Sequence, residues 1–329
     1  MPLSLAGKVA VVTGSGQGLG LSYACELARR GAAVVVNDVD QDAADRAVTA
    51  VRAAAGTAGA PPRVVAVVAP VGPTATAQQL VGTAVESFGR LDVLVTNAGV
   101  LRDAVLWKMS DDDFDTVVGV HLRGTFTCVR EAAVRFREQG DGGRVICVGS
   151  PTGQRGNFGQ TNYAAAKAGF VGMVRSWAME LARAKVTVNA VVPVAATAMT
   201  ENVPLFKQLA DAAADGGADG GAGGGALRRY ARRALGFGTP DDAAGLVAYL
   251  ASDAAADVTG QAIGIGGDRL ALWSHPTESA VAFTDGGWSA DALHEGFDAL
   301  FGATLQSVGQ ELPAPPESAP ANLPEGRAS

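Results

Sequence analysis

A glycine-rich turn near the N-terminus has the composition to hold an anion. Residues 13–20 read Thr-Gly-Ser-Gly-Gln-Gly-Leu-Gly, between a short apolar run at 9–13 and a helical pattern at 19–30. Glycines permit a tight turn and a close approach of backbone to a pyrophosphate, and a helix N-terminus then points free N–H groups at the anion. The position after a first strand predicts a dinucleotide site. Its candidate contacts are Gly14, Ser15, Gln17, Gly18, Leu19 and Gly20.

A carboxylate follows the second apolar run. Asp38 lies about 20 residues past the glycines, where an acidic side chain can hydrogen-bond the ribose hydroxyls of a dinucleotide. It would repel a phosphate on that ribose, and neither the turn nor residues 38–40 contain Lys or Arg. The pattern therefore favours NAD over NADP as the cofactor. The alternative is that Asp38 only caps the helix that follows.

Strand and helix patterns alternate along most of the chain. This alternation is typical of βαβ units on a parallel sheet, and nearly wholly apolar strands are buried on both faces. The predicted fold is α/β, a single Rossmann-like doubly wound parallel seven-stranded sheet with helices on both faces, over residues 1–267. The strands are expected at 9–13, 33–36, 64–68, 91–95, 144–148, 186–192 and 261–265, and the helices at 19–30, 41–55, 76–88, 111–138, 162–184 and 243–252.

The C-terminal part departs from this alternation. Residues 268–311 carry several aromatic side chains, and we expect this appendage to pack on the domain or on a partner subunit. Residues 312–329 hold five prolines and few apolar side chains, which predicts a disordered tail. Residues 215–226 are only Gly, Ala and Asp, a flexible insert by composition.

Composition excludes several classes of protein. The chain has 329 residues, 48% hydrophobic and 18% charged, so it can bury a core, and its net charge of −7 argues against a nucleic-acid partner. Its three cysteines form no CxxC pair, so neither a disulfide framework nor a metal site is expected. No apolar run approaches the ~20 residues of a membrane span, and the N-terminus has no signal pattern. A soluble cytoplasmic protein is expected.

Four motifs in order resemble the short-chain dehydrogenase/reductase family. They are TGxxxGxG at 13–20, Asn97-Ala98-Gly99 after the fourth predicted strand, Ser150, and Tyr163-x-x-x-Lys167. The resemblance covers about residues 5–267 and implies an oxidoreductase that interconverts an alcohol and a ketone with a nicotinamide cofactor.

The resemblance implies a role for each catalytic motif. Tyr163 would be the acid/base, and Lys167, one helical turn later on the same face, would lower the tyrosine's pKa and bind the nicotinamide ribose. Ser150 would hold the substrate oxygen as charge develops. The remaining cofactor contacts would be Asn97, Ala98 and Gly99 on the ribose side, and Pro193 and Thr197 at the carboxamide.

Three positions depart from the family pattern. Val194 replaces the usual glycine after Pro193, which puts the geometry of that loop in doubt. Pro70-Val71 stands where an Asp usually touches adenine, so adenine binding would rely on Val71 and packing. His121 replaces an Asn that anchors a water-based proton relay in many members; it either joins such a relay or is structural.

Several stretches resemble a narrower group, the dehydrogenase unit of peroxisomal multifunctional enzymes, which is itself similar to 17β-hydroxysteroid dehydrogenases. They are Asn37-Asp38, residues 97–103, residues 120–124 and residues 156–160. This implies an NAD-dependent dehydrogenase of a (3R)-3-hydroxyacyl-CoA or of a steroid-like alcohol. The alternatives are an NADPH-dependent 3-oxoacyl-[acyl-carrier-protein] reductase and a non-catalytic NAD-sensing protein.

The resemblance also bears on the lid and on assembly. Residues 200–237, with the insert at 215–226, would form the lid over the substrate, although an insertion without a role explains the glycines equally well. A homodimer, or a homotetramer, would form through the helices at 111–138 and 162–184.

Overall fold

The computed structural model describes residues 2–55, 63–196 and 229–309. Three predicted features lie outside these ranges: Thr197, the insert at 215–226 with most of the predicted lid, and the tail at 312–329.

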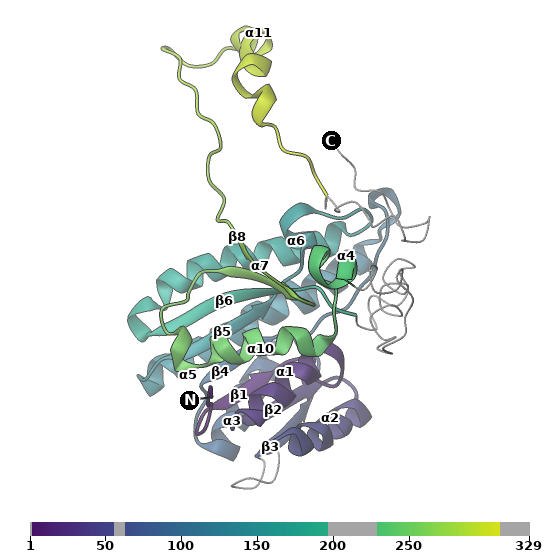
Figure 1. Cartoon of the computed structure of the whole chain (residues 1–329), viewed down its shortest axis with the longest axis vertical. Coiled ribbons are helices and arrows are strands. Elements are labelled where there is room, and N and C mark those ends of the chain that lie inside the picture. Colours follow the sequence, from purple (N-terminus) through teal and green to yellow (C-terminus); the bar gives the residue numbers. More distant parts are fainter. Residues whose placement is uncertain (1, 56–62, 197–228, 310–329) are drawn as a thin grey trace.

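The described residues form one sheet of eight strands in the order β3-β2-β1-β4-β5-β6-β7-β8 (Figure 1). The first seven strands are parallel and β8 runs antiparallel to β7. The predicted fold class is thus confirmed, with one strand more than the seven expected. The strands are β1 (Val9–Val12), β2 (Ala33–Asp38), β3 (Val64–Val68), β4 (Val93–Thr96), β5 (Gly143–Val148), β6 (Val186–Pro193), β7 (Ala262–Gly266) and β8 (Arg269–Trp273).

The strand order reverses beside β1, and this places the site. β1 pairs with β2 on one side and with β4 on the other, so the chain after β3 crosses over to start the second half of the sheet. In open α/β sheets such a reversal opens a crevice at the carboxyl ends of the strands, where ligands bind. The glycine-rich turn follows β1 and Asn97 follows β4, so both lie at this crevice.

Helices cover both faces of the sheet because successive strand residues point to opposite sides. Val9 and Val11 of β1 join one core with α3, α5 and α7, whereas Ala10 and Val12 join the other with α1, α2 and α10. The helices of the domain are α1 (Gly18–Arg29), α2 (Gln41–Ala54), α3 (Thr74–Phe88), α4 (Asp111–Val118), α5 (Gly124–Gln139), α6 (Thr152–Arg155), α7 (Thr161–Glu180) and α10 (Pro240–Ala251).

The helical pattern at 111–138 is one continuous helical run that contains a π-helical turn. This turn, η2 (Gly119–Arg123), links α4 to α5 without a break in helical backbone angles. A π turn adds one residue to a helical repeat and often marks a functional position. Here it carries His121.

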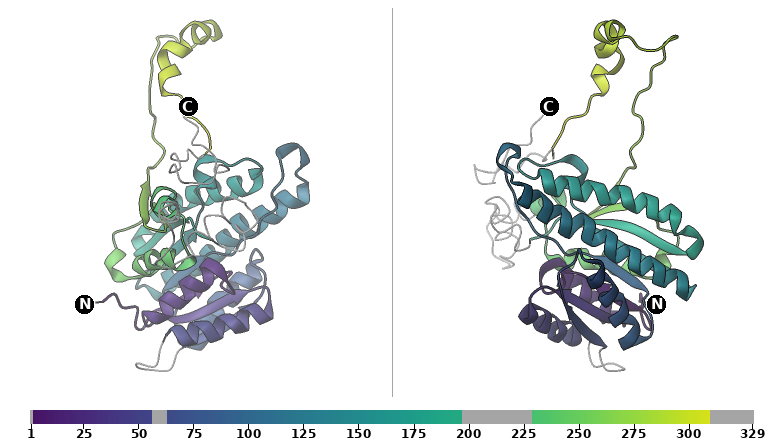
Figure 2. Two further views of the ribbon diagram at one scale, coloured as in Figure 1. Left: turned by 45° about the vertical axis from the view of Figure 1, so that its right-hand side comes forward. Right: turned by 180° about the vertical axis from the view of Figure 1, so that it is seen from behind.

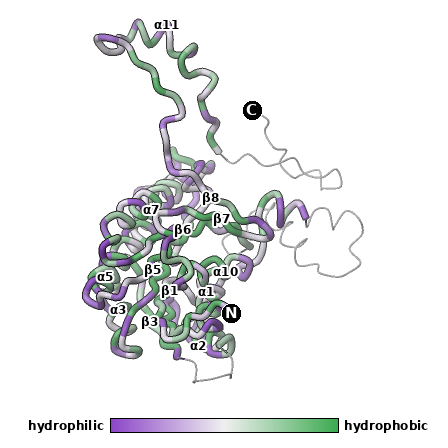
Figure 3. The backbone as a smooth tube through the Cα atoms, turned by 60° about the vertical axis from the view of Figure 1, so that its left-hand side comes forward, coloured by the Kyte–Doolittle hydropathy of each residue, from purple (hydrophilic) through white to green (hydrophobic). Residues whose placement is uncertain are grey.

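The predicted appendage at 268–311 packs on its own domain only in part. Its first residues, Arg269–Trp273, form the eighth strand, because Gly267 adopts a positive φ of 52° that lets the chain reverse after β7. Residues 274–309 then leave the body and carry α11 (Ala290–Phe301), which stands apart from the domain (Figures 1 and 2). Coloured by hydropathy, the backbone shows apolar residues in this projecting part as well as in the sheet (Figure 3).

The described residues contain neither a candidate membrane span nor a candidate metal cluster. None of their helices is long and apolar enough to cross a membrane. Among the same residues, no group of three or more His, Cys, Asp or Glu could hold a metal ion.

Candidate active site

Side-chain hydrogen bonds tie the glycine-rich turn to two neighbouring strands. The backbone N–H groups of Asn97 and Ala98 donate to Thr13 Oγ1 over 3.0 and 3.1 Å, and Asn97 Nδ2 donates to the Gly14 carbonyl over 2.8 Å. On the other side, the Ser15 hydroxyl donates to the Val12 carbonyl and accepts the Asn37 N–H. The turn is therefore held in place before any ligand arrives.

Three of the glycines are required by close approaches. A Cβ on Gly14, whose φ is +59°, would lie 2.6 Å from the Ala98 Cα. A Cβ on Gly20 would lie 2.2 Å from the Gly14 carbonyl oxygen, and one on Gly16 would lie 2.3 Å from Asp38 Oδ2. Real Cβ atoms do not come so close, so the turn can keep this tight path only with glycine.

The start of α1 offers donors to an anion. Its N-cap residue, Gln17, makes no side-chain hydrogen bond to the first turn, and that turn contains no acidic side chain. The free N–H groups and the positive end of the helix dipole therefore face the glycine-rich turn without an internal acceptor. Gly18, Leu19 and Gly20 belong to this first turn, so the residues present fit a dinucleotide pyrophosphate.

Asp38 holds the edge of the same turn and does not cap α2. Its Oδ2 accepts the Gly16 N–H over 3.0 Å, and its Oδ1 accepts the N–H groups of Val39 and Asp40. The N-cap of α2 is Asp40, whose carboxylate accepts the Ala43 N–H over 2.7 Å. The capping alternative is therefore wrong, and Asp38 presents a part-exposed carboxylate beside the glycine-rich turn.

Val71 is predicted to contact adenine from its place in the chain alone. It follows β3 by three residues, is partly buried and packs near Gly124, where a Cβ would lie 3.0 Å from Val71 Cγ2. Its contact with adenine stays a prediction.

Ser150, Tyr163 and Lys167 come together at the ends of β5 and α7. Ser150 follows β5, and its hydroxyl hydrogen-bonds Tyr163, which lies in the first turn of α7. Lys167, one turn further along, is 4% exposed; its Nζ donates to the Val148 carbonyl over 2.6 Å and lies 5.5 Å from the centre of the Tyr163 ring. The predicted trio thus forms one cluster at the carboxyl edge of the sheet.

Burial shifts the two titratable members of this trio in opposite directions. It lowers the pKa of Lys167 to about 7. Burial also raises the pKa of Tyr163. The hydrogen bond with Ser150 favours the phenolate and lowers this pKa, but its effect is smaller than that of burial. Without cofactor Tyr163 is therefore protonated at neutral pH. Lys167 can lower the pKa of Tyr163, as predicted from the sequence, only when its ammonium group is charged.

His121 lies against Tyr163. Its ring meets that of Tyr163 edge to face with centres 5.1 Å apart, and its Nε2 lies 2.8 Å from the Val100 carbonyl oxygen and 3.0 Å from the Val100 nitrogen. Gly99 makes room for it, since a Cβ there would lie 2.3 Å from His121 Cε1. Its Nδ1 is buried and has no hydrogen-bond partner.

His121 is neutral in the folded protein. Burial, and then the charge of Lys167, lower its pKa to about 3. Any relay through this ring would therefore use the neutral imidazole, and participation in a relay stays a prediction.

The buried histidine makes stability fall as pH falls. Above a pH of about 6.5 the residue is neutral in both states; below it the unfolded chain binds a proton that the folded chain takes up only near pH 3. We expect wild-type protein to lose about 2 kcal/mol more unfolding free energy between pH 7 and pH 5 than His121→Gln. Urea unfolding of both proteins at the two pH values measures this, and equal losses would contradict the neutral state.

Asn162 is a functional candidate that the sequence argument missed. It is 0% exposed; its Nδ2 donates to the carbonyls of Arg102 and Asp113 over 2.9 and 3.1 Å, and its Oδ1 accepts the Tyr163 N–H over 2.7 Å. It joins the loop after β4, helix α4 and the start of α7 at one point. Its position directly before Tyr163 was the only signal in the sequence.

Removing this amide should destabilise the protein. Asn162→Ala removes the donor to two carbonyls and the acceptor of the Tyr163 N–H, and we expect a loss on the order of 3 kcal/mol in unfolding free energy. Chemical denaturation measures the loss. Asn157→Ala, an exposed site in the nearby loop, is the control and should change stability by less than about 0.5 kcal/mol. Equal stability of Asn162→Ala and wild type would show that the three hydrogen bonds contribute nothing.

The predicted carboxamide loop is only partly described. Pro193 ends β6, and the N–H of Val194 donates to the Ile265 carbonyl over 2.9 Å, as a continuation of strand pairing. The backbone of residue 194 passes close to Gly266, where a Cβ would lie 2.2 Å from the Val194 carbonyl oxygen. The loop thus leaves the sheet at the same edge as Ser150.

Comparisons with known proteins agree with this geometry. The family described as short chain dehydrogenase matches residues 8–207. A solved short chain dehydrogenase from Mycobacterium avium superposes with a TM-score of 0.75 at 32% identity, over 92% of this chain and 98% of that one.

Curated relatives differ in how much of their length the chain spans. A peroxisomal multifunctional enzyme type 2 of Drosophila melanogaster is 44% identical over 60% of this chain, which spans only 33% of that protein. A hydroxyacyl-CoA dehydrogenase of Mycobacterium tuberculosis is 41% identical over 83% of this chain and 81% of its own length. A 3-oxoacyl-[acyl-carrier-protein] reductase of Thermotoga maritima is 37% identical over 80% of this chain and 98% of its own length.

The family match over most of the described domain agrees with the turn, the trio and the strand order. The chain belongs to the short chain dehydrogenase family, whose members are oxidoreductases that act on CH–OH groups.

Proposed function

We propose that this protein is an NAD-dependent dehydrogenase that oxidises the secondary alcohol of a (3R)-3-hydroxyacyl-CoA to the 3-oxoacyl-CoA. The observation that carries the cofactor choice is Asp38, held by three backbone N–H groups at the edge of the glycine-rich turn. A carboxylate fixed there accepts hydrogen bonds from ribose hydroxyls and repels a ribose phosphate.

The catalytic residues have separate tasks in this proposal. The Ser150 hydroxyl holds the substrate oxygen, and Tyr163 Oη takes the hydroxyl proton as the carbon–oxygen double bond forms. Lys167, fixed by the Val148 carbonyl, would bind the nicotinamide ribose and favours the phenolate when charged. When bound, the nicotinamide ring supplies the acceptor for the hydride that leaves the carbinol carbon.

Relatives support the substrate class without fixing it. The name of the M. tuberculosis relative points to hydroxyacyl-CoA chemistry, and that of the T. maritima relative points to carrier-bound 3-oxoacyl groups. A second candidate, reduction of a 3-oxoacyl carrier protein with NADPH, is favoured by the nearly full coverage of that relative. Asp38 and the absence of Lys or Arg at 38–40 count against it.

A substrate panel separates these candidates. We would compare kcat/KM for (3R)-3-hydroxyacyl-CoA, a 17β-hydroxysteroid and, in reverse with NADPH, a 3-oxoacyl carrier protein. The proposal expects the CoA thioester to rank first. First rank for the steroid keeps the chemistry and replaces the substrate, first rank for the carrier protein with NADPH overturns the cofactor assignment, and NAD binding without turnover of any substrate favours a sensing role.

A further inference from the structure

The segments after β4 and β5 meet at the start of α7. The N–H of Ala104, in the loop after β4, donates to the Gly159 carbonyl over 2.9 Å, and Ala104 pairs with Gln160 in an isolated parallel bridge. Gln160 is the N-cap residue of α7, and Tyr163 follows it by three residues. The side chain of Gln160 therefore lies where the elements that carry the predicted site residues join.

The amide of Gln160 uses both of its ends at this junction. Its Oε1 accepts the Thr152 hydroxyl over 3.2 Å and Asn157 Nδ2 over 2.9 Å, and its Nε2 donates to Asp103 Oδ2 over 2.9 Å. The opposite orientation of the amide would turn its NH2 group toward that of Asn157 and its oxygen toward the Asp103 carboxylate, so only one orientation satisfies all three contacts. The side chain does not cap α7, as that of an N-cap residue usually does. It joins α6, the loop after α6 and the loop after β4 instead.

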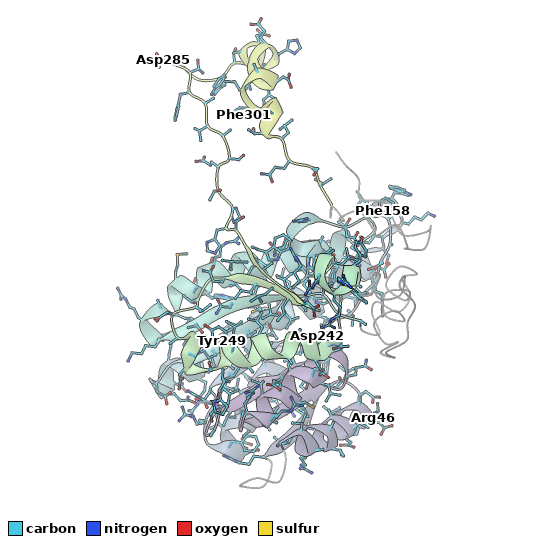
Figure 4. All side chains as sticks on the ribbon, viewed as in Figure 1. Arg46, Phe158, Asp242, Tyr249, Asp285 and Phe301 are labelled. Atoms are coloured by element: carbon cyan, nitrogen blue, oxygen red, sulfur yellow. The ribbon has the colours of Figure 1, made fainter. Side chains whose placement is uncertain are left out.

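The loop between α6 and α7 depends on polar contacts for its position. Helix α6 has four residues, and a helix of one turn is unstable by itself in water. In the loop that follows, residues 156–160, Gly156 and Gly159 both have a positive φ of 77°. The large apolar side chain of this loop, Phe158, is 81% exposed and adds no packing (Figure 4). The hydrogen bonds of Gln160 therefore hold a part of the chain that has no apolar core of its own.

The position of α6 determines where the Ser150 hydroxyl lies. The Thr152 N–H donates to Ser150 Oγ over 3.2 Å, and the Gly153 N–H donates to the Ser150 carbonyl over 3.1 Å. Thr152 is also the residue whose hydroxyl binds Gln160. Helix α6 lies directly on α7, since a Cβ on Gly153 would lie 2.6 Å from the Lys167 carbonyl carbon. A shift of Thr152 therefore moves the Ser150 hydroxyl relative to α7.

The contact with Asp103 extends the junction to the loop after β4. Burial is the largest cause of the raised pKa of Tyr163, and the charge of the Asp103 carboxylate adds to it. The carboxylate is thus close enough to Tyr163 to act on it, and the hydrogen bond from Gln160 Nε2 fixes it there. One amide therefore holds two groups that act on the Tyr163 hydroxyl, Asp103 directly and Ser150 through Thr152.

We propose that Gln160 is a positioning residue: its amide holds α6, and with it the Ser150 hydroxyl, in place against the start of α7. This inference rests on the proposed function, because it concerns an alcohol oxidised between Ser150 and Tyr163. A displacement of a reacting group by about 1 Å can lower the rate on the order of 100-fold. Loss of the amide should therefore lower kcat, whereas NAD binding at the glycine-rich turn should persist.

Gln160→Leu removes the amide and nearly keeps the size of the side chain. For the best alcohol substrate of the panel we expect kcat to fall at least about tenfold, with the KM for NAD within about twofold of wild type. Gln261→Leu is the matched control. Gln261 is also half-buried and its side chain donates one hydrogen bond, to the Thr259 carbonyl over 2.9 Å, but it lies at the amino end of β7, on the opposite edge of the sheet. It should keep both constants, and near-UV circular dichroism checks that both variants fold.

An exchange of donor and acceptor separates positioning from a general loss of structure. Gln160→Glu keeps the acceptor for Thr152 but turns a second carboxylate toward Asp103, so it should lower kcat as Gln160→Leu does. In Asp103→Asn/Gln160→Glu the new Asn can donate to the new Glu, so every hydrogen bond of the junction can form again. We expect this double variant to recover kcat to within about threefold of wild type. Wild-type kcat in Gln160→Leu, or a double variant no faster than Gln160→Glu, overturns the proposal.

Hydrogen exchange of the amides at 152–156 gives a readout that needs no substrate. These amides donate to carbonyl and hydroxyl oxygens of residues 150–152. They should exchange at least about tenfold faster in Gln160→Leu than in wild type, and at the wild-type rate in Gln261→Leu. If wild type oxidises no alcohol, the proposed function fails and this exchange decides the positioning role by itself. Equal exchange in the three proteins would then refute that role.

Discussion

Replacing Tyr163 by Phe should reduce kcat at least about 1,000-fold, while NAD affinity changes by less than about threefold. The phenol oxygen is the group at the Ser150 hydroxyl that can take the alcohol proton, and Phe removes only that atom. The ring itself packs edge to face with His121, 5.1 Å between centres, and that packing is kept. Steady-state rates and a fluorescence titration of NAD measure the two effects separately.

Tyr249→Phe is the matched control for this loss. Tyr249 lies on α10 and is 39% exposed (Figure 4). It should keep wild-type kcat within about twofold, as is usual for an exposed side chain. A Tyr163→Phe enzyme that turns over at more than about a tenth of the wild-type rate would remove this residue from the acid/base role.

Replacing Asp38 by Ser should shift cofactor preference toward NADP. A carboxylate about 5 Å from a ribose phosphate repels it by on the order of 3 kcal/mol per unit charge near a protein surface. We therefore expect the ratio of kcat/KM for NADP to that for NAD to rise at least about tenfold. Part of the change will be lower NAD efficiency, because the Gly16 N–H loses its acceptor over 3.0 Å.

Asp40→Asn is the control for Asp38. It removes a carboxylate two residues away but keeps a good N-cap for α2, since the Asn side chain can also accept the Ala43 N–H. Its cofactor ratio should stay within about twofold of wild type. An Asp38→Ser enzyme with an unchanged ratio would mean that the carboxylate only holds the turn and does not select the cofactor.

Local patterns were enough to predict the seven parallel strands and the glycine-rich turn. Each parallel strand is centred on a short run rich in Val, Ile and Ala, and each lies within two residues of its predicted ends because such short runs, bounded by turn residues, are typical of strands buried on both faces. β8 was missed because Arg269–Trp273 has exposed Arg269, Leu270 and Leu272 and depends on pairing with β7. An edge strand of this kind is set by tertiary pairing.

In the candidate site, too, some features could be predicted from local patterns and others depend on tertiary contacts. The motif residues lie where parallel-strand topology must bring them, at the carboxyl ends of neighbouring strands. The partners of Asn162 and His121 could not be predicted, because both contact loops about 20 or more residues away in sequence, and the π turn that carries His121 has no sequence signature. The aromatic content of residues 268–311 predicted packing on the domain or on a partner subunit; residues 274–309 project from the domain, and packing on a partner stays a prediction.

The most direct test of the proposed function is NADH formation at 340 nm from (3R)-3-hydroxyacyl-CoA, with NAD and NADP compared at equal concentration. The account predicts turnover with NAD, at least about tenfold less with NADP, and none with the (3S) enantiomer. Activity with NADP alone, or equal rates with both enantiomers, would contradict it.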